Sequence, residues 1–136
     1  MEDKRKFWCE MGCEAESVES LRASLKGATT FLDLLVSPAS QTDEIIMITD
    51  ADLERPGPRI VFVNPAFTRV TGFSGAEAVG KSPRILQGPG TDRSLMRQMV
   101  ATLKNGEPFY CESVNYKKGG APYTVEWHIS PVRDAT

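Results

Sequence analysis

The chain has 136 residues, of which 40% are hydrophobic and a quarter are charged, and its formal net charge is −2. This composition is ordinary for one soluble domain, and it shows no basic stripe that would indicate nucleic-acid binding. No run approaches the roughly eighteen apolar residues of a membrane-spanning helix, and the N-terminus lacks a signal-peptide core. We therefore expect a cytoplasmic protein without a membrane partner.

The cysteine and histidine content argues against two kinds of site. Cys9, Cys13 and Cys111 are an odd and poorly spaced set, which does not suit a disulfide framework. His128 is the single histidine, which argues against a zinc site, so no metal ligands are predicted. The sequence leaves the role of the three cysteines open.

The first forty residues divide into two segments. Residues 1–13 mix charged and aromatic residues without a usable period, so we expect them to be frayed or disordered. Residues 14–40 carry the apolar stripe of an amphipathic helix, with spacings of three and four: Val18, Leu21, Leu25, Ala28, Leu32 and Leu35. Such a stripe is typical of a helix that pairs with a second copy, or of one that lies on its own domain. We interpret it as a signalling and dimerisation helix.

A β region follows, and then two short helices. The β-branched runs at 44–49 and 59–63, separated by a turn at 55–58, predict an antiparallel hairpin with a long loop. Asn64 followed by Pro65 predicts the start of a short helix. Ser74 with Glu77 three residues later predicts the cap of another.

The stretch at 80–92 contains three glycines and two prolines around the apolar pair Ile85-Leu86. These residues do not fit an ordinary helix or strand. Arg84 and Gln87 lie three residues apart, so they share one face of a single helical turn. Such a turn suits the wall of a pocket, although a plain surface connection between two helices has a similar composition.

The last third of the chain predicts one longer helix and a second hairpin. Asp92 is placed to cap a helix that ends at Asn105-Gly106. Strands are expected at 109–116 and 121–132, around a turn at 117–120. The order of elements predicts an α+β fold with helices segregated onto an antiparallel sheet.

Several spaced motifs resemble a PAS domain of the light-oxygen-voltage (LOV) branch: Asn64-Pro65-Ala66-Phe67, Thr71-Gly72-Phe73, the stretch at 80–89, and Asn115-Tyr116-Lys117-Lys118-Gly119. The resemblance covers about residues 43–134, and we take 41–136 as the sensory domain. It implies a sensory and dimerisation module attached to an output domain such as a kinase, and not an enzyme in itself. The family's sheet has five strands and four are visible here, so we expect the final strand to be cut off or supplied by a partner.

The resemblance also makes the photochemistry of that branch doubtful here. Where LOV domains have Asn-Cys-Arg-Phe-Leu-Gln, this chain has Ser82-Pro83-Arg84-Ile85-Leu86-Gln87. Pro83 stands at the position of the photoactive cysteine, so no cysteinyl–flavin adduct is expected there. Cys111 lies on another element, where we interpret it as core filler and not as a substitute.

The flavin contacts that the resemblance implies are kept in part. Arg84 matches a phosphate-binding arginine, Gln87 a glutamine near the ribityl chain or ring, and Asn115 an asparagine at the ring edge. Ser82 replaces an asparagine that helps to hold the flavin. Val125 replaces a second ring-edge asparagine, and Arg97 is placed to compensate in part for a second phosphate arginine.

Trp127 leaves two alternatives open for this pocket. By strand parity it points the same way as Tyr123, Val125 and Ile129. These groups can stack on the isoalloxazine of FMN or FAD, which predicts a redox sensor or an adduct-independent light sensor. They can equally fill the space, which predicts a cofactor-free dimerisation and relay module. No catalytic residues are predicted, and the partners expected are a second copy, through the N-terminal helix and the outer sheet face, and an output domain.

Overall fold

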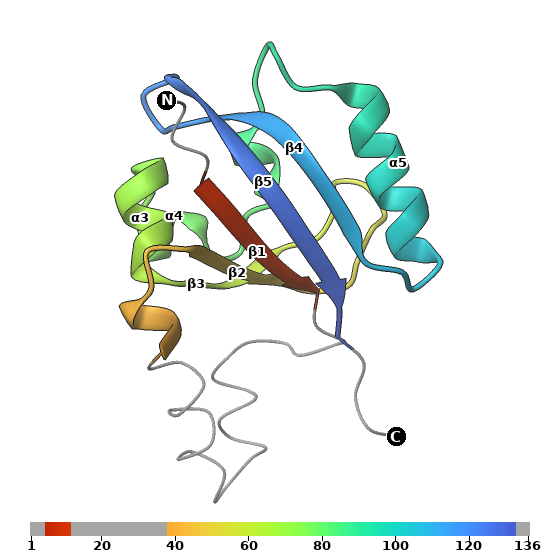
Figure 1. Ribbon diagram of the computed structural model, residues 1–136, viewed down its shortest axis with the longest axis horizontal. Helices are drawn as coiled ribbons and strands as arrows, with labels where there is room; N and C mark the ends of the chain where they lie inside the picture. Colours follow the sequence, from red (N-terminus) through yellow and green to blue (C-terminus); the bar gives the residue numbers. More distant parts are fainter. Residues whose placement is uncertain (1–4, 12–37, 133–136) are drawn as a thin grey trace, which may run out of the picture.

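A computed structural model describes residues 5–11 and 38–132 (Figure 1). The described residues form one five-stranded sheet, with helices packed against one of its faces. This is the predicted α+β arrangement.

The sheet has the strand order β3-β2-β1-β5-β4. The two predicted hairpins are present: β2 (Ile45–Thr49) pairs antiparallel with β3 (Ile60–Val63), and β4 (Phe109–Tyr116) pairs antiparallel with β5 (Pro122–Pro131). The remaining strand, β1 (Arg5–Met11), lies between them and runs parallel to both β2 and β5. The sheet is therefore mixed, and β1 joins its two hairpins.

Strand β1 corrects the expectation that residues 1–13 are unstructured and that only four strands are present. Phe7 is in register with Ile45 of β2 on one side and with Trp127 of β5 on the other. Each hairpin would otherwise leave an inner edge of unpaired backbone N–H and C=O groups, and a central strand satisfies both edges. This segment is a strand because it pairs on both sides, although its local sequence pattern does not predict one.

The predicted amphipathic helix at 14–40 falls almost wholly within residues 12–37, which lie outside the described residues. The helix and its role in dimerisation therefore stay predictions.

The helices begin where the sequence predicts. The side chain of Asn64 accepts a hydrogen bond from the Phe67 N–H and caps α3 (Pro65–Thr71). Ser74 caps α4 (Gly75–Ala78), and Asp92 caps α5 (Arg93–Lys104). The breaker-rich stretch forms a single turn of 3-10 helix, η1 (Pro83–Leu86). Helices α3 and α4 lie beside β2 and β3, whereas α5 lies beside β4 (Figure 1).

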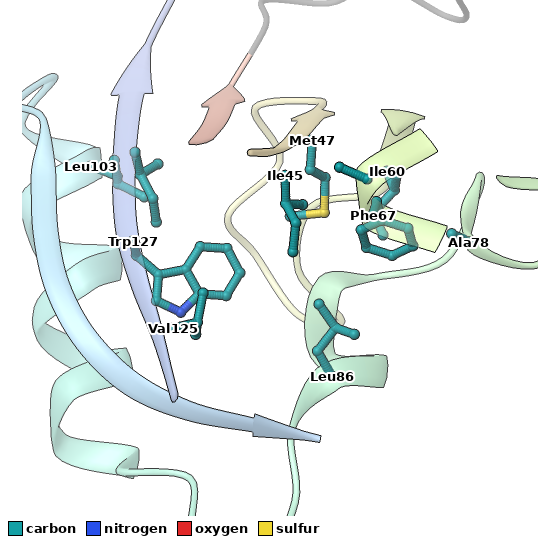
Figure 2. Packing of buried hydrophobic residues seen from close by; sticks show 11 residues of the cluster. Ile45, Met47, Ile60, Phe67, Ala78, Leu86, Leu103, Val125 and Trp127 are labelled. Carbon is teal, nitrogen blue, oxygen red and sulfur yellow. The ribbon is translucent and has the colours of Figure 1, made fainter. Parts of the chain in front are cut away.

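The core lies between the inner face of the sheet and these helices (Figure 2). Strand β5 alternates as predicted, with Val125, Trp127 and Ile129 buried on the inner face. Other elements add apolar side chains to the same cluster: Ile45, Met47, Ile60, Phe67, Ala78, Leu86 and Leu103. Packing is not complete, because a cavity remains on the side of η1 and α5.

Candidate functional site

The cavity has a volume of about 380 Å³ and lies among the inner face of the sheet, η1, α5 and the loop at 53–58. That volume is in the range of small-molecule sites. Its inner wall is largely apolar and comes from strands and from α5: Met47, Met96, Met99, Val100, Leu103, Trp127 and Ile129. An apolar wall of this kind suits a flat ring system.

Four arginines line the outer part of the same cavity: Arg55, Arg84, Arg93 and Arg97. All four are exposed, and none takes part in an ion pair with another described residue. Glu54 is the one carboxylate among the lining residues, and it is 3.0 Å from the Lys104 ammonium group. The rim therefore has an excess of positive charge, which suits an anionic group such as a phosphate.

The turn η1 presents its polar side chains to the cavity. Ser82 accepts a hydrogen bond from the Arg84 N–H at 3.3 Å and so caps the turn, and Pro83 takes the first position. The side-chain Oε1 of Gln87 accepts a hydrogen bond from the Arg93 guanidinium at 3.0 Å. Arg84 and Gln87 both line the cavity, as the predicted one-turn helix requires.

The loop at 53–58 crosses close to η1. Gly57 is buried with φ +100°, and a Cβ at this position would lie 3.5 Å from both Arg84 Nε and Ser82 Oγ. Asp50 holds the base of the loop, because its side chain accepts a hydrogen bond from the Arg59 N–H at 2.9 Å. The ion pair of Glu54 with Lys104 ties the loop to the end of α5. This path of the loop places Arg55 at the edge of the cavity.

Asn115 on β4 is the most unusual polar group of the site. It is only 4% exposed and lines the cavity, yet its side-chain Nδ2 has no hydrogen-bond partner in the described structure. A buried amide donor without a partner costs about 1–3 kcal/mol, so such groups are rare in folded proteins. Asn115 thus brings an unpartnered amide donor to the wall of the cavity, where it is a candidate donor to a bound molecule.

Tyr123 faces Asn115 across the hairpin of β4 and β5. Its hydroxyl is also buried without a hydrogen-bond partner, although the residue is not among those that line the cavity. Burial raises the pKa of Tyr123 to about 12, and the neighbouring Asn115 amide opposes this shift. The two groups lie close together but do not satisfy each other with good hydrogen-bond geometry.

Trp127 contributes an aromatic face to the cavity. The side chain is 9% exposed, and its indole N–H donates to the Ser113 hydroxyl at 2.8 Å. Figure 2 shows the indole directed from β5 toward the interior, above Val125. The cavity of about 380 Å³ is present with this side chain in place, so Trp127 does not fill the pocket.

Most of the residues predicted for the site line this cavity: Ser82, Arg84, Gln87, Arg97, Asn115 and Trp127. Val125 does not, because it is completely buried in the core beneath Trp127. Cys111 is also absent from the lining, and burial raises the pKa of its thiol to about 11. A protonated thiol outside the cavity agrees with its interpretation as core filler.

Arg55, Arg93 and Ser113 line the site without having been predicted. Ser113 shares strand parity with Asn115, and Arg93 precedes Arg97 by one helical turn. The periodicity of the strand and of the helix could therefore have placed both residues in the site. No local sequence pattern could have placed Arg55 in the site, because only the folded loop brings it to η1.

The described residues contain no group of three or more His, Cys, Asp or Glu side chains that could hold a metal ion. Within 5–11 and 38–132, no helix is long and apolar enough to cross a membrane. The apolar wall, the unpartnered amide of Asn115 and the arginine rim together suit a molecule that combines a flat apolar ring, a polar ring edge and an anionic tail.

The five-stranded sheet with helices on one face, and the cavity between them, are the architecture of a sensory domain of the α+β class. The family model of the PAS domain matches residues 43–136, and the chain belongs to the PAS domain family.

Curated relatives include the blue-light-activated histidine kinases of Brucella canis and Brucella abortus, each 39% identical over 90 residues. The match covers 66% of this chain but only 18% of each kinase. The chain thus spans less than a fifth of the length of these relatives.

Three solved structures of LOV proteins share the fold. An RNA-binding light-oxygen-voltage receptor gives a TM-score of 0.69 at 27% identity, over 81% of this chain and 30% of that one. A light-oxygen-voltage domain studied with a flavin analogue gives a TM-score of 0.64 at 28% identity, over 80% of this chain and 77% of that one. The LOV domain of a blue-light activated histidine kinase from Erythrobacter litoralis gives a TM-score of 0.60 at 26% identity, over 67% of this chain and 81% of that one. The chain is a PAS domain with LOV-type structural neighbours, and its role is that of a signalling sensor.

Proposed function

We propose that this sensory domain binds a flavin, FMN or FAD, non-covalently in the cavity beside η1. The observation that carries the proposal is the buried residue Asn115, which lines the cavity and whose Nδ2 has no hydrogen-bond partner in the described structure. A carbonyl oxygen at the edge of an isoalloxazine is an acceptor of the kind that this donor needs.

The rest of the cavity supports the same ligand. The apolar wall with Trp127 suits the ring, and Arg84 and Arg97 at the rim suit the ribityl phosphate. Because Gln87 uses its carbonyl oxygen to bind Arg93, its amide N–H groups are the ones left for the ligand. When bound, a flavin supplies blue-light absorption and reversible redox chemistry.

We infer that any light response is independent of a cysteinyl adduct. Pro83 takes the first position of η1 and lines the cavity, and proline has no nucleophilic group. Cys111 does not line the cavity, and its raised pKa keeps the thiol protonated at neutral pH. The stimulus is then the redox state of the flavin, or light acting without a covalent bond to the protein.

The absorbance spectrum of protein purified in the dark tests this function directly. The expected result is a blue-region band with vibronic structure, and release of FMN or FAD on denaturation. The variant Asn115→Leu keeps the size of the side chain and removes the donor, so it should retain far less flavin. A colourless wild-type protein that does not take up added FMN or FAD would contradict the proposal.

The second candidate function is a cofactor-free module for dimerisation and relay. At position 125 the resemblance implies an asparagine that contacts the edge of the flavin ring. This chain has Val125 there, which packs in the core and offers no polar group to a flavin, and this favours the alternative. The failure of wild-type protein to bind either flavin would support this alternative.

We propose further that the domain works in the cytoplasm as a homodimer, joined to an output domain. Tyr110 is 61% exposed on the outer sheet face and packs edge-on against His128, with ring centroids 5.0 Å apart. An exposed aromatic group on this face is a suitable partner for the apolar stripe at residues 18–35. Replacing Leu25 and Leu32 together by Asp should convert the dimer to a monomer in sedimentation experiments. An unchanged dimer would contradict this assignment.

A further inference from the structure

We propose that Trp127 is a reversible one-electron donor to a photoexcited flavin in this cavity, held in place by Ser113. The inference rests on the proposed function and deepens it, because it says what the pocket does with absorbed light. It starts from an oxidisable indole that is 9% exposed, lines the cavity and has its N–H bonded to the Ser113 hydroxyl at 2.8 Å.

The indole is suited to this step by its chemistry and its position. Tryptophan is among the most easily oxidised side chains, and a photoexcited flavin is a strong one-electron oxidant. A ring that lines the same cavity of about 380 Å³ lies within short range of any flavin bound there. The Ser113 hydroxyl accepts from the indole N–H and so fixes the orientation of the ring.

The step is balanced without any further reactant. Trp127 loses one electron and the excited flavin gains it, and the return of that electron restores both groups. The indole N–H proton stays in its hydrogen bond, because the neutral hydroxyl of Ser113 is too weak a base to remove it. No bond is formed or broken, and no external reductant is consumed.

The other candidate donors near the cavity are less suitable. Oxidation of a tyrosine requires the loss of its hydroxyl proton, but the Tyr123 hydroxyl has no partner to accept one. Burial also raises the pKa of Tyr123, which opposes proton loss, and the residue does not line the cavity. Cys111 is outside the lining as well. Within the described lining, Trp127 is the single aromatic side chain.

Reversible transfer from Trp127 shortens the excited state and returns the absorbed energy as heat. A pocket that quenches in this way leaves no lasting product of illumination. The inference therefore favours the redox state of the flavin, and not light, as the stimulus that this domain reports.

The test compares the fluorescence lifetime of FMN bound to the wild-type chain and to Trp127→Phe. Both proteins are loaded in the dark and matched by flavin absorbance. We expect a several-fold longer lifetime and a higher flavin fluorescence yield in the variant. The control is Trp8→Phe, which removes the other tryptophan of the chain. Trp8 lies on β1 in register with His128, and its replacement should leave the lifetime unchanged.

A second variant, Ser113→Ala, keeps the indole and removes its hydrogen-bond acceptor. We expect an intermediate lifetime, because the ring is less well oriented and its oxidised form loses a stabilising contact. Equal lifetimes in the wild-type chain, Trp127→Phe and Ser113→Ala, all with bound FMN, would overturn the inference and leave flavin binding intact. Failure of the wild-type chain to take up FMN would be seen in the absorbance first, and it would overturn the proposed function and the inference together.

Discussion

Asn64 and Asn115 are both almost completely buried, yet their surroundings differ. The Asn64 side chain donates to the carbonyl oxygens of Ala39 and Glu44, both at 2.8 Å. Its oxygen accepts from the backbone N–H groups of Ile46, at 2.9 Å, and Phe67, at 3.2 Å. Asn115 is also buried, but its amide nitrogen has no partner in the described structure.

The difference separates a structural asparagine from a candidate ligand-binding one. The Asn64 side chain accepts from backbone N–H groups of both Ile46 and Phe67, so it joins the start of α3 to β2. Asn115 lines the cavity, and no described group satisfies its amide nitrogen. Burial alone does not tell the two roles apart, whereas the hydrogen-bond partners do.

The largest effect should come from Asn64→Leu. The substitution removes four hydrogen bonds of the Asn64 side chain, to Ala39, Glu44, Ile46 and Phe67, so we expect the free energy of unfolding to fall by about 3 kcal/mol or more. Urea denaturation followed by circular dichroism measures this change. A loss below that of an average surface substitution would show that water or the backbone replaces the side chain.

The matched change, Asn115→Leu, should act in the opposite direction on stability. Removing an unpartnered buried amide raises the free energy of unfolding of the ligand-free protein by about 1 kcal/mol. The same change should weaken FMN binding at least tenfold, measured by fluorescence titration. A destabilised ligand-free variant would indicate that Asn115 has a structural partner after all.

From the raised pKa of Tyr123, which lies beside Asn115, we expect the protein to lose stability at alkaline pH. In the unfolded chain its hydroxyl ionises near its usual pKa of 10.0, whereas in the folded chain the pKa is raised to about 12. The contribution to stability is therefore complete below pH 10 and is lost as the pH rises toward 12, by about 1–2 kcal/mol. Tyr123→Phe should remove this part of the pH dependence. Identical alkaline unfolding profiles of the variant and the wild-type chain would contradict the assignment.

The smallest effect concerns Tyr116, which follows Asn115 on β4. Its hydroxyl accepts a hydrogen bond from the Gly90 N–H at 2.6 Å, and its ring lies where a side chain at Gly88 would be. Tyr116→Phe keeps the ring and removes the hydroxyl, so we expect a loss of about 0.5–1 kcal/mol in the free energy of unfolding. Gly88→Ala should cost more, because a Cβ there would lie 2.4 Å from the ring. The reverse order would mean that the hydrogen bond, and not the close approach, holds this loop.

Much of the fold could be predicted because its signals are local. The caps Asn64, Ser74 and Asp92 begin the helices that the sequence predicts, and the inner face of β5 follows from its alternation. Strand β1 could not be predicted, because residues 5–11 become a strand through pairing with two distant hairpins. The bonding of Asn64 to Ala39 and Glu44 is equally non-local, so the sequence predicted only its role as a helix cap.

The candidate site was predictable to the extent that it depends on single elements. One-turn spacing placed Arg84 and Gln87 together, and strand parity placed Trp127 on the inner face. Val125 has the same parity, but neighbouring side chains enclose it completely, which parity cannot indicate. The approach of Arg55 depends on the path of the loop at 53–58 against η1, which only tertiary structure determines.

The position of β1 has a mechanical consequence. Strands β2 and β5 do not pair with each other, so in the described sheet the hairpin that carries Asn115 and Trp127 is joined to the other hairpin through β1. Any tilt or slide of the cavity-lining hairpin must be transmitted as a displacement of β1, since the backbone hydrogen bonds along both of its edges resist shear. A displacement that begins at Asn115 or Trp127 therefore reaches the rest of the sheet through its central strand.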